Sequence, residues 1–244
     1  MTVLAYAFAA VLAGQEAPPP AAAEGPGSPV EATPAPPAIE APADPAELAK
    51  AAEPTFEQIR TATERFRDVK VALAEGYTRD PMDECVTAES IGYPADSGTM
   101  GIHYARDDLL GITAPPNPRV SGTGTHTDFN KPAILIYEPR HDGSLELVAV
   151  ENLVFKKAWH DAGNKEPPVF HGVPYDSMQD DPATKPDEGH MFEPHYDRHV
   201  WLYRENPGGM FAQFNRNVSC SAHKAKHAET AAKVSGLAKD VTEF

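Results

Sequence analysis

The chain of 244 residues carries 36 acidic and 21 basic residues, which gives a formal net charge of −15 at pH 7. No cluster of lysine and arginine stands beside aromatic residues, so the composition argues against a nucleic-acid-binding surface. The length is sufficient for one domain of ordinary size with additional segments at its ends.

Residues 1–16 are predicted to form a signal peptide. Residues 1–13 are apolar, are fewer than the ~20 that cross a bilayer, and suit the hydrophobic region of such a peptide. The basic region that normally precedes it is missing, because the first lysine or arginine is Lys50. The alternative is a disordered or loosely packed N-terminus. We expect export to the periplasm or the medium, with no membrane span in the mature chain.

Residues 17–54 are predicted to be a disordered linker. They hold eleven of the 25 prolines and no aromatic residue, so their apolar surface is too small to offset the entropy lost on folding. Residues 55–220 then form a single predicted globular domain. Residues 221–244, rich in alanine and lysine, are predicted to be a tail or a marginal helix.

The first element of the domain is predicted to be a helix that begins after Thr55 and ends at Gly76. Apolar residues recur at helical spacing, at Ile59, Ala62, Phe66, Val69 and Leu73. Thr55 is a favourable N-cap, and Gly76 is suited to the left-handed conformation that often ends a helix. Residues 78–99 are rich in turn-forming residues and are expected to be irregular.

Later segments have the composition of β-strands, namely residues 100–104, 131–139, 145–155 and 198–205. Asp142 and Gly143 lie between the second and third of these and indicate a hairpin turn. Residues 163–190 are rich in proline and aspartate and are expected to be a long loop that covers a site or is disordered. The predicted fold class is α+β: an N-terminal helix packed on a small, mostly antiparallel sheet with long loops.

The two cysteines, Cys85 and Cys220, lie near opposite ends of the predicted domain. They do not form a CxxC pair, so neither a thioredoxin-like redox motif nor a zinc ribbon is indicated. In an oxidising compartment the simplest arrangement is one disulfide that ties the ends of the domain together. The alternative is two unpaired, buried thiols.

Glu151 is the most informative single residue, because it interrupts the apolar run LVAVENLVF. The residues that share a face by strand alternation are Leu147, Ala149, Glu151 and Leu153. A carboxylate on such a face is costly unless it is paired, hydrogen-bonded or bound to a metal ion. The alternatives are a buried salt bridge and an edge position from which Glu151 reaches water.

His195 and His199 stand four residues apart, ahead of the β-prone residues 200–203. On a straight strand they share a face but are ~13 Å apart, which is too far to bind one ion directly. On a helix they would be ~6 Å apart and able to share an ion. The residues that would share the strand face of these histidines are Asp197, Trp201 and Tyr203. Because large aromatic residues belong to this face, we expect it to be covered and to line a site.

The predicted metal ligands are His103, Glu151, His195 and His199. Three imidazoles and a carboxylate suit a divalent transition-metal ion, namely Fe, Mn, Cu or Zn. Whether His195 and His199 share one ion stays open at this point.

Two classes of function are compatible with these residues. The first is an exported, soluble metal-binding protein whose mononuclear centre acts as an oxidoreductase. The alternative is a non-enzymatic envelope protein that binds a small ligand in the same cleft. A third interpretation is a structural domain whose histidines only satisfy hydrogen bonds. The expected partners are a metal ion or a small molecule, and nucleic acid is not among them.

The segments MGIHY, LELVAVEN and HYDRHVWLYRENPGGMFAQFNRNVSC resemble a group of secreted bacterial proteins of unknown function. In that group an N-terminal helix and these segments span the whole domain, which corresponds here to Phe56 through Cys220. The resemblance implies that the segments belong to one domain, and it implies no activity.

Overall fold

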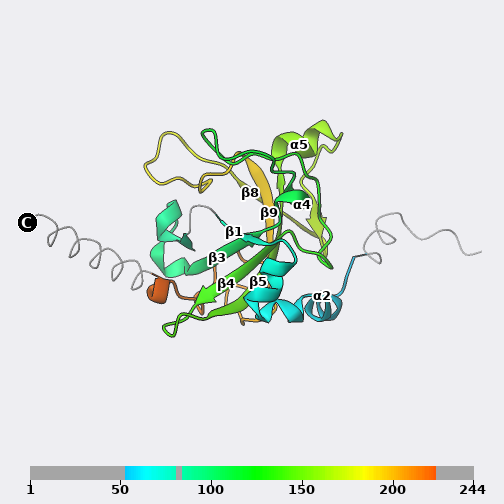
Figure 1. Cartoon of the computed structure of the whole chain (residues 1–244). Helices are drawn as coiled ribbons and strands as arrows, with labels where there is room; N and C mark the ends of the chain where they lie inside the picture. Colours follow the sequence, from blue (N-terminus) through cyan, green and yellow to red (C-terminus); the bar gives the residue numbers. More distant parts are fainter. Residues whose placement is uncertain (1–52, 81–83, 224–244) are drawn as a thin grey trace, which may run out of the picture. The chain divides into compact units, whose positions relative to one another are not determined.

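The fold is built on an antiparallel sheet whose central strands are long and buried (Figure 1). The computed structural model describes residues 53–80 and 84–223. Within them the sheet has seven strands in the order β1-β3-β4-β5-β9-β8, with β2 also paired to β3. The strands are β1 (Thr78–Arg79), β2 (Cys85–Thr87), β3 (Thr99–Ala105), β4 (Ile134–Pro139), β5 (Leu145–Phe155), β8 (Asp176–Met178) and β9 (His195–Val200). The predicted α+β class with a mostly antiparallel sheet is confirmed.

The helical segment at the start of the domain is divided into three pieces, α2 (Phe56–Thr63), η1 (Glu64–Arg67) and α3 (Val69–Ala74). Thr55 is the N-cap, as predicted, and it forms a reciprocal capping box with Gln58. The prediction of a single continuous helix is wrong. Asp68 has an extended conformation, and its side chain accepts a hydrogen bond from the Lys70 amide, which begins a new helix.

The interruption at Asp68 changes which side chains face the sheet. Ile59 and Phe66 are buried as the helical spacing predicts. In α3, however, Ala72 is buried while Leu73 is 50% exposed. The apolar periodicity therefore identifies the buried face up to Phe66, and the break rotates the residues that follow.

The two faces of the sheet bury different sets of residues. Ile59 and Phe66 pack on the face that includes Tyr137 and Val150, which we call the helical face. The opposite face carries His103, Glu151, His195, Asp197 and His199, and we call it the histidine face. Apolar residues of the histidine face form a second cluster that includes Ile134, Ile136, Leu153, Phe155 and Trp201.

A bulge in β5 determines which of its residues reach the histidine face. The register with β4 pairs Ile136 with Ala149 but Tyr137 with Leu147, so Val148 is the additional residue. Leu147 consequently packs in the helical-face cluster. The predicted common face is thus correct for Ala149, Glu151 and Leu153 and wrong for Leu147.

The strand predicted at residues 198–205 begins earlier and ends sooner, as β9. Beyond it, Trp201 remains beside His199, with ring centroids 6.1 Å apart. Tyr203 instead belongs to the helical side, where its hydroxyl lies 2.8 Å from the Thr63 hydroxyl and donates to the Arg60 carbonyl at 3.1 Å. The predicted shared face of His199 and Tyr203 is wrong, because the alternation between the two faces continues through Trp201 and Leu202 and ends before Tyr203.

The segment from 156 to 192 contains more regular structure than a loop. It begins with α5 (Lys156–Asp161), and its first part forms a hairpin of β6 (Val169–Phe170) and β7 (Val173–Pro174). Phe170 packs in the helical-face cluster. The remaining short elements are η2 (Glu89–Ile91), η3 (Ala95–Ser97) and α4 (Asp107–Leu110).

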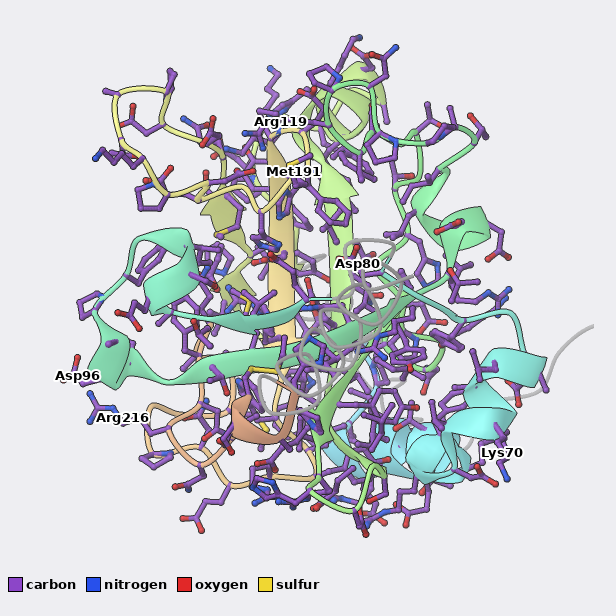
Figure 2. The ribbon with its side chains drawn as sticks, turned by 60° about the vertical axis from the view of Figure 1, so that its left-hand side comes forward. Lys70, Asp80, Asp96, Arg119, Met191 and Arg216 are labelled. Atoms are coloured by element: carbon purple, nitrogen blue, oxygen red, sulfur yellow. A yellow bond between two sulfur atoms is a disulfide. The ribbon has the colours of Figure 1, made fainter. Side chains whose placement is uncertain are left out.

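The second part of this segment is attached to the region around Arg119. That guanidinium forms ion pairs of 2.9 Å with Asp180 and of 2.9 Å with Asp187. The Val120 amide donates to the Met191 carbonyl at 2.8 Å, and Figure 2 shows Arg119 and Met191 next to each other. Residues 180–192 are therefore held near the histidine face.

Cys85 and Cys220 form a disulfide, as predicted, so the alternative of two unpaired thiols is excluded. It links β2 to a segment 135 residues later in the chain. No helix within the described residues is long and apolar enough to cross a membrane.

Three predicted segments lie mainly outside the described residues: the signal peptide 1–16, the linker 17–54 and the tail 221–244. The last two residues assigned to the linker are described, and both contact His171. The Glu53 carboxylate accepts a hydrogen bond from the His171 amide at 2.7 Å, and the Pro54 carbonyl lies 3.0 Å from the His171 Nε2 atom.

Candidate metal centre

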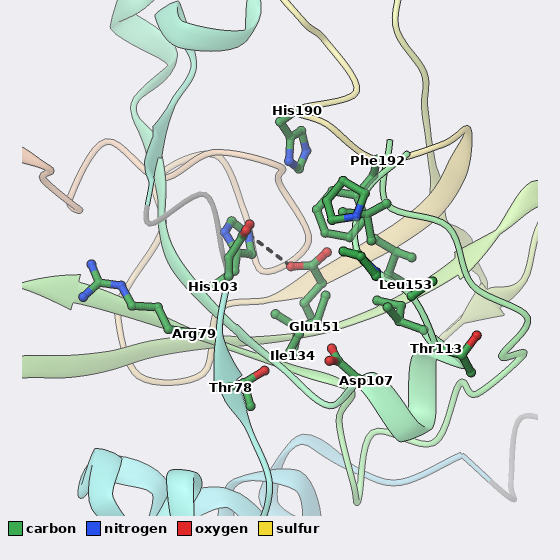
Figure 3. Close-up of a pocket in the computed structure, with 17 residues that line it drawn as sticks. Thr78, Arg79, His103, Asp107, Thr113, Ile134, Glu151, Leu153, His190 and Phe192 are labelled. Carbon is green, nitrogen blue, oxygen red and sulfur yellow. Dashed lines mark ion pairs between the residues drawn. The ribbon is translucent and has the colours of Figure 1, made fainter. Parts of the chain in front are cut away.

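Three side chains from three strands converge on the histidine face. His103 comes from β3, Glu151 from β5 and His199 from β9, and one potential ligand atom of each lies within 4.8 Å of the others. Glu151 and His199 are direct cross-strand neighbours. β4 lies between β3 and β5, so the side chains of His103 and Glu151 meet above it (Figure 3).

The carboxylate of Glu151 stands between the two imidazoles. Its Oε2 atom is 3.4 Å from the His103 Nε2 atom and 3.5 Å from the His199 Nε2 atom. The residues are 2%, 7% and 0% exposed, respectively. None of these three atoms has a hydrogen-bond partner among the described residues. Buried polar atoms are usually paired, so this group requires an explanation.

Electrostatics keep the carboxylate ionised in this position. Burial alone raises the pKa of the Glu151 carboxyl, but the charges of His199 and His103 outweigh burial and hold the pKa at about 2. Burial lowers the pKa of His199. It also acts on His103, but the facing carboxylate more than offsets it and raises the pKa of that imidazole. The group therefore combines a carboxylate with an imidazole that is neutral at pH 7.

His190 is a fourth polar residue beside these three side chains, and it was not among the predicted ligands. Its ring centroid lies 6.2 Å from that of His103, and it lines the cavity described below. Both His190 and Met191 have positive φ values, of 34° and 71°. Asp187 stabilises this turn, because its carboxylate accepts from the Met191 amide and also pairs with Arg119. The only signal in the sequence was a histidine at the end of the predicted covering loop.

His195 does not join the group of three, although it was predicted as a ligand with them. It is fully buried, and its Nδ1 atom is 2.9 Å from the Glu193 carbonyl oxygen. Its Nε2 atom lies 3.9 Å from Asp197 Oδ2. The structure thus brings together His103, Glu151 and His199, and it places His195 in a separate environment farther along β9.

A cavity of about 420 Å³ opens onto the group. His103, Glu151 and His190 lie in its wall, and Figure 3 shows them facing the same space. The remaining wall is largely apolar and includes Ile112, Val120, Ile134, Leu153 and Phe192. A cavity with apolar walls and a few converging polar groups is the usual form of a small-molecule site.

Comparisons of the chain with protein-family models, with curated proteins and with solved structures found no match. The resemblance to secreted bacterial proteins therefore stays a prediction.

Proposed function

We propose that the protein binds a divalent transition-metal ion through His103, Glu151 and His199. The observation that carries this proposal is the convergence of three buried ligand atoms within 4.8 Å, from three different strands. Ligand atoms that bind one ion at ~2 Å each are at most about 4 Å apart. Small side-chain adjustments are enough to bring the three atoms to that separation.

Hydrogen bonding alone accounts poorly for the arrangement. The distances of 3.4 and 3.5 Å from the Glu151 oxygen to the two imidazole nitrogens exceed the usual 2.7–3.2 Å range. The removal of a carboxylate and two imidazoles from water costs several kcal/mol unless strong partners replace the water. A cation between the three atoms would supply that compensation for all of them at once.

The donor set suits a centre with free coordination positions. Two imidazoles and one carboxylate form the ligand set common in non-haem iron enzymes, and Mn, Cu or Zn also accept these ligands. We propose that the centre acts as an oxidoreductase on a small molecule bound in the 420 Å³ cavity. Non-enzymatic binding of a small ligand is the second candidate, and the same cavity supports it.

We further propose that the protein is exported. The Cys85–Cys220 disulfide supports this, because stable disulfides are found mainly in oxidising compartments. The apolar residues 1–13 are in agreement with a signal peptide, and sequencing of the N-terminus of the secreted or periplasmic protein tests this point.

Metal analysis of tag-free protein tests the main proposal. Wild-type protein purified without chelators is expected to contain at least one transition-metal ion per chain. His199→Ala and Glu151→Gln are each expected to reduce that content well below wild type, because each removes one ligand. His141→Ala is the matched control, since His141 is exposed in the hairpin turn. Wild-type protein without stoichiometric metal, or variants with unchanged content, would contradict the proposal.

A further inference from the structure

His195 and Asp197 are a second pair of buried polar side chains on the histidine face. They lie two residues apart on β9, and they are 0% and 1% exposed. Both carboxylate oxygens of Asp197 and the Nε2 atom of His195 lack a hydrogen-bond partner among the described residues. Neither residue belongs to the group formed by His103, Glu151 and His199.

The hydrogen bond of His195 determines which of its ring nitrogens can bind a ligand. Its Nδ1 atom lies 2.9 Å from the Glu193 carbonyl oxygen, which can only accept. Nδ1 therefore carries the proton, and in the neutral ring Nε2 has a free lone pair. Histidines that bind metals usually donate their other N–H to a carbonyl or a carboxylate in this way.

The lone pair of His195 faces another acceptor. Asp197 Oδ2 lies 3.9 Å from the His195 Nε2 atom. This distance exceeds that of an O–H···N hydrogen bond, whereas two ligand atoms that bind one ion at ~2 Å each can be about 4 Å apart. A cation between these two buried acceptors would compensate both of them.

His190 is the candidate for a third ligand, because its ring lies close to that of His195. Its ring centroid is 5.8 Å from that of His195, with the ring planes at 90°, and its Nε2 atom has no partner within the described part of the chain. The ligand atoms of His190, His195 and Asp197 do not all lie within 4.8 Å of one another. The three residues bind one ion only if His190 moves closer to His195 and Asp197.

We propose that His195, Asp197 and His190 form a second cation-binding position beside the His103/Glu151/His199 group. Two imidazoles and a carboxylate again suit a divalent transition-metal ion such as Zn, Fe or Mn. The centre then holds two ions, whereas the sequence suggested a mononuclear one. The position stands on its own residues and does not require the first site to be correct.

Titration of the chelator-stripped full-length protein with Co²⁺ tests the second position. Wild-type protein is expected to bind two Co²⁺ ions per chain, counted by elemental analysis after removal of free metal and followed by visible absorption. Asp197→Asn and His195→Gln are each expected to bind one. The carboxamide of Asp197→Asn can donate a hydrogen bond to the His195 Nε2 atom. This hydrogen bond compensates the imidazole in the absence of the ion, so the variant is expected to fold. Asp96→Asn, at an exposed position, is the matched control and is expected to bind two.

The outcomes separate the two sites. Wild-type saturation at one ion, with Asp197→Asn unchanged, would overturn the second position and indicate that protonated Asp197 donates to His195. A different result would be that wild-type protein binds one ion, Asp197→Asn binds none and Glu151→Gln still binds one. This result would support the second position and contradict the first. If circular dichroism shows that Asp197→Asn is unfolded, His195→Gln and the wild-type stoichiometry decide the question.

Discussion

Neighbouring residues of β9 are buried to the same degree on the two faces of the sheet, but their polar groups are satisfied differently. Arg198 points to the helical face and is 2% exposed, and His199 points to the histidine face and is 0% exposed. Arg198 donates hydrogen bonds to the Pro174 and Phe211 carbonyls, and it forms an ion pair of 3.3 Å with Asp176. Neither ring nitrogen of His199 has a hydrogen-bond partner in the described part of the chain.

The atoms without partners also differ in kind between the faces. On the helical face they are Arg198 Nε, Asn152 Nδ2 and the Tyr175 hydroxyl, when only the described residues are considered. These are donors or a hydroxyl, and one water molecule can pair with them. On the histidine face they include the Glu151 and Asp197 carboxylate oxygens and imidazole nitrogens that lie 3.4–3.9 Å from them. A cation would compensate such a group, so the proposed metal site predicts that the two faces respond differently to substitution and to metal removal.

The largest effect on stability is expected from the disulfide, which belongs to the helical-face cluster. The double variant Cys85→Ser/Cys220→Ser releases a loop with a sequence separation of 135. In the chain-entropy model this lowers the free energy of unfolding by about 5 kcal/mol. Urea unfolding of the two proteins measures the difference. Metal content under folding conditions is expected to remain at the wild-type level. A loss of metal would contradict the claim that the helical face stabilises the fold independently of metal binding on the histidine face.

The next largest effect is expected from Arg198→Met, which keeps an apolar side chain of similar length. The variant removes the charged donor to the Pro174 and Phe211 carbonyls, and hydrogen bonds that involve a charged group contribute about 1.5–3 kcal/mol. We expect a loss of about 3 kcal/mol in the free energy of unfolding of the metal-free protein. Co²⁺ stoichiometry measured on the folded variant should match wild type. Unchanged stability would show that these contacts do not make the helical face stable.

Metal removal is expected to act on the histidine face alone. An ion that is present at ~100 times its dissociation constant stabilises the folded state by about 2.7 kcal/mol. Chelation should therefore lower the thermal transition of wild-type protein, as scanning calorimetry measures. The decrease should be smaller in Glu151→Gln, which lacks a ligand, and unaltered in Arg198→Met. An equal decrease in all three proteins would contradict the assignment of the ion to this face.

Local patterns in the sequence predicted most of the fold and failed where tertiary contacts decide. The N-cap Thr55 and the turn at Asp142 and Gly143 depend on neighbours within a few residues, and both are confirmed. The additional residue in β5 at Val148 depends on pairing between strands. The end of β9 depends on contacts between Tyr203 and the helical segment. No local pattern predicts the latter two features.

The same distinction holds for the candidate site. Glu151 was recognisable because a charge in an apolar run has to be compensated. His199 was identified from the polar residues that alternate along β9. His190 could not be found, because its position depends on the ion pairs of Arg119 with Asp180 and Asp187, far apart in the sequence. The spacing of His195 and His199 left open whether they share an ion, because it allows this on a helix and excludes it on a straight strand. The structure places both residues on strand β9.

The smallest effect, and the sharpest contrast with Arg198→Met, is expected for Glu151→Gln in the metal-free protein. The facing Glu151 carboxylate raises the pKa of His103 above its usual value of 6.5. A raised folded-state pKa contributes stability that is complete below 6.5 and is lost as the pH rises through the folded-state value. Below that range charged His103 pairs with Glu151, so the variant should be less stable than wild type at pH 6.

Above the folded-state pKa of His103 the imidazoles are neutral, and the buried carboxylate keeps its desolvation cost without a compensating charge. The low pKa of Glu151, about 2, is maintained by charged His199 and His103, so this advantage also disappears once they are deprotonated. The uncharged carboxamide avoids the desolvation cost and can donate a hydrogen bond to a neighbouring imidazole nitrogen. Glu151→Gln should therefore be at least as stable as wild type at pH 9. Urea unfolding of both metal-free proteins at pH 6 and pH 9 measures this difference. A constant deficit of the variant at both pH values would mean that Glu151 stabilises the fold in the same way as Arg198.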